Sequence, residues 1–354
     1  MTAQRKTHIG IRGEDFTING ELTYKGRHWR NMRIEGLLIN QRWVQAIFDD
    51  RNAETRRQWN YPDGPWDAER NVREFLEHLP AWRAAGVLSF DVNFQGGSPR
   101  GYTRGKQPWH NSAFEADGTL RDDYADRMRR VLDAADELGM APMVGFFYFG
   151  QDERLTDEAA VLRAADQATD WLLGQGYRHV LIEIANEINV SKYEHAILTP
   201  ERCPELIERV RERCCGRFPV GISMGGGKVP PDPIIAASDY IMLHGNGVKD
   251  PNRIREMVDQ TRASRTYRGQ PVVFNEDDHF DFDQDDNNFI AALSRHASWG
   301  MFDWRMEGED YHHGFQSVPV DWRPEASQRK RDFVKLCAEI TGGKVPAAVA
   351  EQLT

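Results

Sequence analysis

Cysteine is scarce in this sequence. Four cysteines occur among 354 residues, and two of them, Cys214 and Cys215, are adjacent. No two cysteines have the Cys-x-x-Cys spacing that is typical of zinc sites and redox motifs. A disulfide framework is also excluded, because such frameworks belong to short, cysteine-rich secreted chains. We therefore expect reduced, structural thiols.

Long apolar runs and excess positive charge are missing as well. No run approaches the ~20 apolar residues of a membrane-spanning helix, and the opening MTAQRKTHIG has no apolar signal segment. Asp and Glu outnumber Lys and Arg by 55 to 45, which gives a net charge of −10 and no general attraction to nucleic-acid phosphates. The sequence thus predicts a cytoplasmic protein that binds neither membrane nor nucleic acid, and it does not indicate the oligomeric state.

A regular alternation of strand-like and helix-like segments fills the chain. Eight apolar runs have the length and composition of strands: 33–40, 86–94, 141–149, 179–187, 219–224, 239–246, 271–276 and 299–304. Amphipathic segments lie between them, except that the connection VPPDP leaves room for one helical turn. Eight strand–helix units predict a (β/α)₈ barrel. No linker divides the chain, so we expect a single catalytic domain over 1–354, with an N-terminal β-hairpin at about 7–28 that turns at Asn19-Gly20.

Polar residues stand at the expected carboxyl ends of these strands, where active sites of such barrels are built. The apolar run LIEIANEINV ends on Asn186 and Glu187, and the seventh strand ends on Glu276. Two carboxyl groups, one protonated and one ionised, are what glycoside hydrolysis requires. Further strand-end candidates for substrate binding are Asn40, Asn93, Tyr148, His244 and Trp304.

These residues resemble clan A of the glycoside hydrolases, the retaining superfamily that includes cellulase-type enzymes. The resemblance rests on Asn186-Glu187 after the fourth strand, Glu276 on the seventh, His244 on the sixth, Trp304 on the eighth and the F-x-I-N-G hairpin at 16–20. It implies an acid/base role for Glu187, a nucleophile role for Glu276, and a hydrogen bond from Asn186 to the sugar 2-hydroxyl, with no cofactor or metal. The clan often carries an Arg near the end of the second strand, where this chain reads FDVNFQGG.

Several alternatives stay open at this point. Glu183 shares strand parity with Glu187 but lies deeper, so we expect a buried, paired group; Asp277 or Asp278 could replace Glu276 if the strand ends later. His244 could be a packed histidine instead of a substrate contact. A metal-dependent barrel hydrolase using His and Asp ligands, and a non-catalytic carbohydrate-binding barrel, are the rival functions.

Aromatic residues are frequent in the loops that follow the strands. Sugar rings pack their apolar faces on aromatic side chains, so such residues favour a carbohydrate substrate; they are Trp43, Trp59, Tyr61, Trp66, Trp109, Tyr148, Tyr193, Trp304 and Tyr311. The long loops 41–67 and 95–118 are the expected walls of the pocket. If they close it, the enzyme acts on chain ends. The acid/base role further predicts that the pKa of Glu187 lies above that of a free Glu while Glu276 is ionised.

Overall fold

The computed structural model describes residues 5–103, 106–190 and 192–352. The chain begins with an antiparallel sheet of three strands, β1 (Ile9–Arg12), β2 (Asp15–Ile18) and β3 (Glu21–Leu22). Strands β2 and β3 pair across Asn19-Gly20, whose positive φ angles of 55° and 81° suit a tight hairpin turn. Strand β1 extends this hairpin on its other side, and a second small hairpin joins β4 (His28–Trp29) to β5 (Met32–Arg33).

Eight short parallel strands form the centre of the molecule, and each lies in or directly after one of the strand-like runs of the sequence. They are β6 (Asn40–Gln41), β7 (Asp91–Asn93), β8 (Met143–Tyr148), β9 (Leu181–Asn186), β10 (Val220–Gly221), β11 (Ile241–His244), β12 (Val272–Glu276) and β13 (Gly300–Met301). The fold is therefore α/β with parallel strands, as the alternation predicts.

The strand pairing does not run as one unbroken ladder. Ladders join β7 to β10 in sequence order, β11 to β12, and β13 to β6, while single bridges such as Arg42–Asp91 and Asp277–Met301 join the ladders. Within the described residues no ladder joins β10 to β11. At that seam the amide of Asp239 donates to the Val220 carbonyl at 2.8 Å, but the Val220 amide donates to the Asp239 side chain at 3.0 Å instead of to a strand. A side chain thus takes the place of the next ladder bond.

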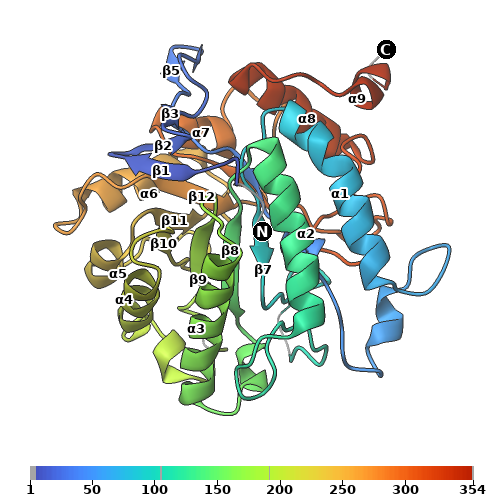
Figure 1. Cartoon of the computed structure of the whole chain (residues 1–354). Helices are drawn as coiled ribbons and strands as arrows, with labels where there is room; N and C mark the ends of the chain where they lie inside the picture. The colour runs from blue at the N-terminus through green and yellow to red at the C-terminus, as the bar shows by residue number, and fades with distance from the viewer. Residues whose placement is uncertain (1–4, 104–105, 191, 353–354) are drawn as a thin grey trace.

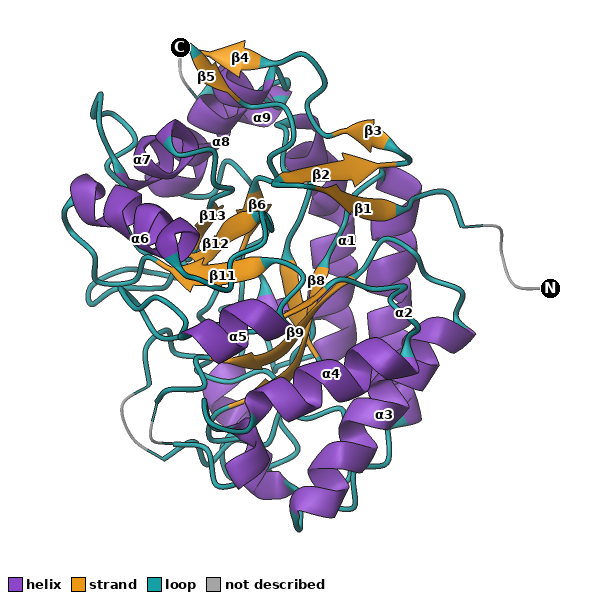
Figure 2. Ribbon diagram, turned by 90° about the vertical axis from the view of Figure 1, so that its left-hand side faces the viewer, coloured by secondary structure: helices purple, strands orange, loops and turns teal. Residues whose placement is uncertain are grey.

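Helices cover the outside of the strands (Figures 1 and 2). They are α1 (Ala68–Ala84), α2 (Asp122–Leu138), α3 (Glu158–Gly174), α4 (Cys203–Arg213), α5 (Asp232–Ala237), α6 (Pro251–Ala263), α7 (Asn288–Ser294), α8 (Gln328–Thr341) and α9 (Ala347–Glu351). The short α5 begins within VPPDP, at Asp232. The sequence pattern does not predict α9, which has one buried residue, Val349.

The N-terminal sheet closes one end of the molecule. Ile9 and Phe16 of this sheet share an apolar cluster with residues at the beginnings of the parallel strands, such as Met143, Leu181 and Val273. In Figure 1 this sheet lies near the top, and the arrowhead of β7 points away from it, toward the bottom. The carboxyl ends of the strands are therefore at the opposite end, where a barrel places its chemistry.

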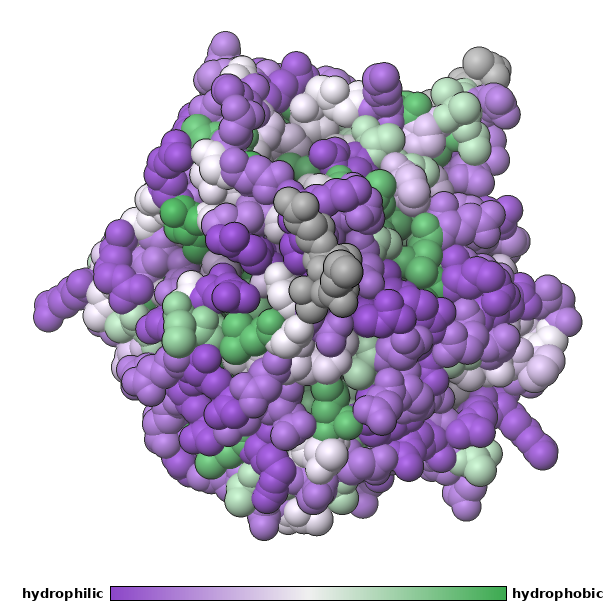
Figure 3. Space-filling view, in the orientation of Figure 1, coloured by the Kyte–Doolittle hydropathy of each residue, from purple (hydrophilic) through white to green (hydrophobic). Residues whose placement is uncertain are grey.

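The face seen in Figure 3 is mainly hydrophilic, with apolar side chains scattered over it. The large aromatic and aliphatic side chains are instead buried between helices and strands. Among the described residues, no helix combines the length and the apolar character needed to cross a membrane.

Candidate active site

Three strand ends bring Glu187, Glu276 and His244 together. Glu276 and His244 are the last residues of β12 and β11, and a register shift after Leu243 sets His244 opposite Glu276. Glu187 directly follows β9 and has a φ angle of 50°. This left-handed conformation is uncommon for a residue other than glycine and turns the chain sharply out of the strand.

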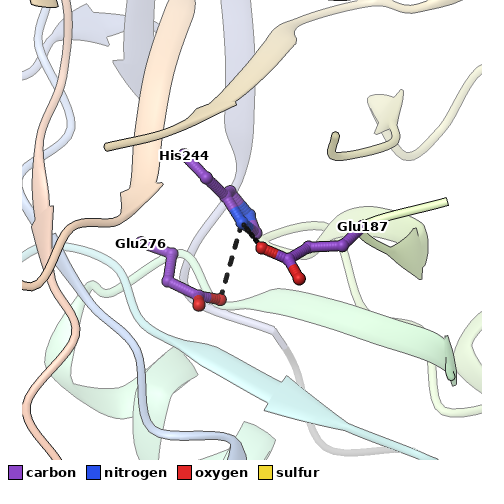
Figure 4. A group of neighbouring side chains, drawn as sticks. All are labelled: Glu187, His244 and Glu276. Carbon is purple, nitrogen blue, oxygen red and sulfur yellow. Dashed lines mark hydrogen bonds and ion pairs between the residues drawn. The ribbon is translucent and has the colours of Figure 1, made fainter. Parts of the chain in front are cut away.

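The three side chains point toward one another (Figure 4). Nδ1 of His244 lies 3.1 Å from Oε1 of Glu187 and 3.7 Å from Oε2 of Glu276. One carboxyl oxygen of each glutamate and a ring nitrogen of His244 all lie within 4.8 Å of one another. The imidazole thus bridges the two carboxyl groups that the sequence singles out.

A buried arginine that the sequence analysis missed lies beneath this group. Arg42 follows β6 and is 1% exposed. Its Nη1 lies 2.7 Å from Asp91 and 2.9 Å from Glu183, and its Nε lies 3.1 Å from Oε2 of Glu276. Its Nη2 donates to Oδ1 of Asn186 at 2.5 Å. One guanidinium therefore connects the first, second, fourth and seventh strands.

The deeper carboxylates are structural. Glu183 accepts a hydrogen bond from Ser223 at 2.6 Å in addition to its ion pair with Arg42, so the expectation of a buried, paired group is confirmed. Asp277 is fully buried and accepts hydrogen bonds from Trp299 at 3.0 Å and from Asn288 at 3.1 Å. Neither side chain is available to a substrate.

Burial and mutual charges shift the pKa values of Glu187, Glu276 and His244. Burial alone would raise the pKa of Glu187, but the hydrogen bond and charge of His244, together with the charges of Arg42 and Lys192, outweigh burial and lower that pKa. Burial raises the pKa of Glu276 more than His244 and Arg42 lower it. Burial alone would lower the pKa of His244, but the charge of Glu276 and the hydrogen bond with Glu187 raise it.

The order of the two glutamate pKa values is therefore the reverse of the order expected from the sequence. The expectation considered two carboxyl groups and left out the imidazole between them. The raised pKa of His244 and the lowered pKa of Glu187 favour a proton on Nδ1 of His244, which lies 3.1 Å from Oε1 of Glu187. Transfer along this bond gives protonated Glu187 and a neutral imidazole without any change in net charge.

A cavity of about 800 Å³ opens above the two carboxyl groups. Glu187, Glu276, Tyr148 and Trp304 line it, as the sequence predicts. The analysis missed much of the remaining lining, which comes from loops: Ser98, Gly101, Tyr102, Thr103, Phe149, Val190, Lys192, Gly226, Asn246, Gly247, Asp278 and Phe302. Asn246 also donates a hydrogen bond to Oε1 of Glu276.

Two of the predicted substrate contacts are buried beside the cavity floor. Asn186 and His244 are at most 1% exposed, and each has a side-chain nitrogen, Nδ2 and Nε2 respectively, without a hydrogen-bond partner in the described parts of the chain. Trp304 likewise has a buried, unpaired Nε1. Unpaired buried donors are costly, so these atoms are suited to bind groups of a substrate.

Three other predicted contacts do not line the cavity. Asn40 is fully buried among the strands and donates to the carbonyls of Leu38 and Phe274. Asn93 is also fully buried and packs against the backbone of Gly145, where an added Cβ would lie 2.5 Å from it. Trp109 packs edge-on against Trp59 at 5.7 Å. Strand ends are a poor guide here because the first two strands end below the cavity.

The expected aromatic rim is largely internal. In loop 41–67, Trp43, Trp59 and Tyr61 are at most 4% exposed, and Trp59 belongs with Trp109 and Phe48 to a separate apolar cluster. Trp43 instead belongs to the main apolar core, and no residue of this loop lines the cavity. The loop 95–118 does form a wall, but through residues 98–103.

Known proteins resemble this chain in structure but not in sequence. No protein-family model matches the sequence, and no curated protein matches it. A family 5 glycoside hydrolase from Bacteroides vulgatus superposes with a TM-score of 0.54 and 14% identity, covering 90% of this chain and 70% of its own. This chain has the fold of family 5 glycoside hydrolases.

Two further solved structures agree. A GH5-4 broad specificity endoglucanase from Bacteroides salanitronis has a TM-score of 0.54 and 12% identity, covering 86% of this chain and 92% of its own. A family 5 enzyme from Prevotella bryantii has a TM-score of 0.54 and 10% identity, covering 86% and 96%. The fold of family 5, which the clan A resemblance implies, therefore extends over most of the chain.

Proposed function

We propose that this protein is a retaining glycoside hydrolase of clan A type, a closed (β/α)₈ barrel that cleaves O-glycosidic bonds of oligosaccharides or glycosides. The observation that carries the proposal is the placement of Glu187 and Glu276 on the floor of one cavity, with carboxyl oxygens no more than 4.8 Å apart. Retaining enzymes hold their two carboxyl groups about 5 to 5.5 Å apart, whereas inverting enzymes need about 6.5 to 9.5 Å to seat a water molecule.

Glu276 acts as the nucleophile and Glu187 as the acid/base. Arg42 keeps a permanent positive charge 3.1 Å from Glu276 and so favours the ionised form that attacks the anomeric carbon. Glu187 receives its proton from His244 and gives it to the leaving oxygen. It then removes a proton from the water that hydrolyses the glycosyl–enzyme bond.

The unpaired donors around the carboxyl groups bind sugar hydroxyls. Nδ2 of Asn186 is proposed to donate to the 2-hydroxyl, and Nε1 of Trp304 to another hydroxyl of the same ring. The indole face of Trp304 offers an apolar surface for the sugar. Which sugar is bound differs among proteins of this fold, since the solved structures include an endoglucanase and an exo-β-1,4-mannosidase.

A metal-dependent hydrolase is the rival with a structural basis, because Glu187, His244 and Glu276 could together hold a cation. The charge of Arg42 beside Glu276 opposes that reading. Metal analysis of protein purified without added ions separates the two functions. A carbohydrate-binding protein without activity is tested by the same assays as the hydrolase, since it would bind sugars and release no product.

Substrates with different leaving groups test the acid/base role of Glu187 and the nucleophile role of Glu276. A dinitrophenolate departs without protonation, so Glu187→Ala is expected to retain much of its rate on a dinitrophenyl glycoside and lose most of it on a disaccharide. Glu276→Ala is expected to fail on both, because no leaving group replaces a missing nucleophile. Azide should accelerate Glu187→Ala by attacking the intermediate without a general base. Equal losses in both variants, with no effect of azide, would contradict the assignment of Glu187.

The stereochemistry is tested separately. Double displacement gives a product whose anomer matches that of the substrate. NMR spectra of the released sugar at early times should therefore show retention. An inverted product would exclude the covalent intermediate on Glu276 even if hydrolysis occurs.

A further inference from the structure

Ser98, Gly101, Tyr102 and Thr103, from the loop after β7, line the cavity, and the segment that they span is called the 98–103 wall below. Side chains of two distant loops hold it. The hydroxyl of Tyr102 donates to Oδ2 of Asp278 at 2.9 Å, and Nζ of Lys192 donates to the carbonyl of Thr103 at 2.7 Å. Asp278 lies just beyond β12, and Lys192 lies in the loop after β9.

Aromatic packing supports the same wall. Tyr102 contacts Phe302 and Trp304 with ring centroids 5.3 Å apart in each case. The backbone lies directly on the indole at Gly101, where a Cβ would come within 2.8 Å of Trp304 and where φ is 88°. Tyr102 is 42% exposed, the highest value for a large hydrophobic side chain in the described part of the chain. Its position therefore depends on these contacts and not on burial in the core.

The two ties connect the wall to loops that follow β9 and β12, at Lys192 and Asp278. Residues at or after the ends of β8, β9, β10, β11, β12 and β13 supply the rest of the lining. An enzyme that cuts inside a polysaccharide needs an open groove on both sides of the scissile bond. Here the tie at Asp278 closes the side of Glu276, the carboxylate that is bonded to the sugar in the intermediate.

We propose, on the basis of the function above, that this enzyme is exo-acting. It accepts the terminal, non-reducing sugar of a short oligosaccharide or glycoside, and Tyr102 is the residue that excludes longer chains on the Glu276 side. Asp278 positions Tyr102. Lys192 supports the wall on the side of Glu187, where the remainder of the substrate leaves the cavity.

The test follows the products of oligosaccharides labelled at the reducing end, made of the sugar that the wild-type enzyme hydrolyses in a panel of nitrophenyl glycosides. The wild type should shorten the labelled chain by one residue at a time and leave the viscosity of the corresponding soluble polymer almost unchanged. Labelled fragments of mixed length at early times would overturn the proposal while leaving the hydrolase function intact. Absence of turnover on every glycoside would overturn both.

Variants of Tyr102 test the wall itself. Tyr102→Phe keeps the ring contacts and removes the hydrogen bond to Asp278. Loss of this bond should shift the equilibrium of the wall by about tenfold away from the position that Asp278 holds. Tyr102→Ala removes both, so internal cuts should rise by at least about tenfold relative to terminal cuts. Tyr267→Phe is the matched control, because it removes a tyrosine–carboxylate hydrogen bond, to Glu14, away from the cavity. Terminal cleavage alone in Tyr102→Ala would show that Tyr102 does not exclude longer chains.

Discussion

A single residue, Arg42, carries the positive charge on which the buried polar group depends. It faces Asp91, Glu183 and Glu276, none of which is more than 5% exposed at its side chain. Three carboxylates share this one guanidinium, and burial raises the pKa of Asp91 above that of an ordinary Asp. The guanidinium is the cation that all three carboxyl groups contact.

Replacing this arginine should destabilise the protein strongly. Arg42→Met leaves buried carboxylates without a partner, which typically costs about 3–5 kcal/mol. Urea unfolding measures the change. Arg51→Met is the control, since Arg51 pairs with Glu115 at 2.9 Å on the surface and an exposed pair contributes about 0–1 kcal/mol. Similar losses in both variants would show that the buried network does not stabilise the fold.

The bridging histidine should set the pH range of activity. In the proposed mechanism Glu276 must be ionised to attack, and its pKa is raised, so activity should fall with decreasing pH at a higher value than for an ordinary Glu. The proton for the leaving group is held by His244, whose pKa is also raised, so the alkaline limb should lie above that of a free imidazole.

In His244→Gln the carboxyl group of Glu187 must hold that proton alone, and the alkaline limb should move to lower pH. Profiles of kcat/KM against pH measure both limbs. His8→Gln, directly before β1 at the end of the molecule that the N-terminal sheet closes, is expected to leave the profile unchanged. An unchanged alkaline limb in His244→Gln would show that the proton does not come from His244.

At the level of single residues, sequence pattern identified the carboxyl groups and missed their cation. Glu187, Glu276 and His244 could be found because each ends an apolar run. Arg42 stands in LLINQRWVQAIF, a lone charge within a largely apolar stretch. Buried charges need partners, so that pattern is a usable signal. The partners themselves come from three other strands and cannot be assigned without the fold.

At the level of elements, periodicity predicted which segments form but not how long they are. The eight strand-like runs each lead to a strand, yet β6, β10 and β13 have two paired residues each. Apolar composition reports burial, and residues beyond a ladder are buried here as well. The loop 41–67 shows the same limit, since its aromatic residues pack into the main core and a second apolar cluster instead of forming a binding rim.

Helix capping gives a prediction that is independent of activity. Oδ1 of Asp67 accepts hydrogen bonds from the amides of Glu69 at 2.8 Å and Arg70 at 3.2 Å at the start of α1. Asp67→Ala should lower the free energy of unfolding by about 1 kcal/mol, whereas Asp67→Asn keeps an acceptor and should cost much less. Urea unfolding and glycosidase assays compare the two. A large loss of activity with unchanged stability in Asp67→Ala would contradict the structural role.

At the scale of the whole molecule, the two ends of the parallel strands differ in polarity. The N-terminal sheet seals one end with apolar contacts, and the polar network around Arg42 lies toward the other. Between β10 and β11 neither a ladder nor a single bridge joins consecutive parallel strands in the described residues. There a carboxylate, Asp239, accepts from the Val220 amide at 3.0 Å and pairs with Arg211 at 3.2 Å.

Hydrogen exchange should therefore find this seam less protected than the strands around it. Local opening costs less free energy where fewer ladder bonds must break, so peptides containing Val220 should exchange faster than those of β8. Asp239→Ala removes the acceptor of the Val220 amide, and its exchange should accelerate by about tenfold or more. Asp166→Ala is the control, because Asp166 pairs with Arg209 and Arg213 on the helical surface and touches no strand bond. Equal protection of β8 and β10 in the wild-type protein, with no change in Asp239→Ala, would mean that the strands close into a ring of uniform strength despite the missing ladder.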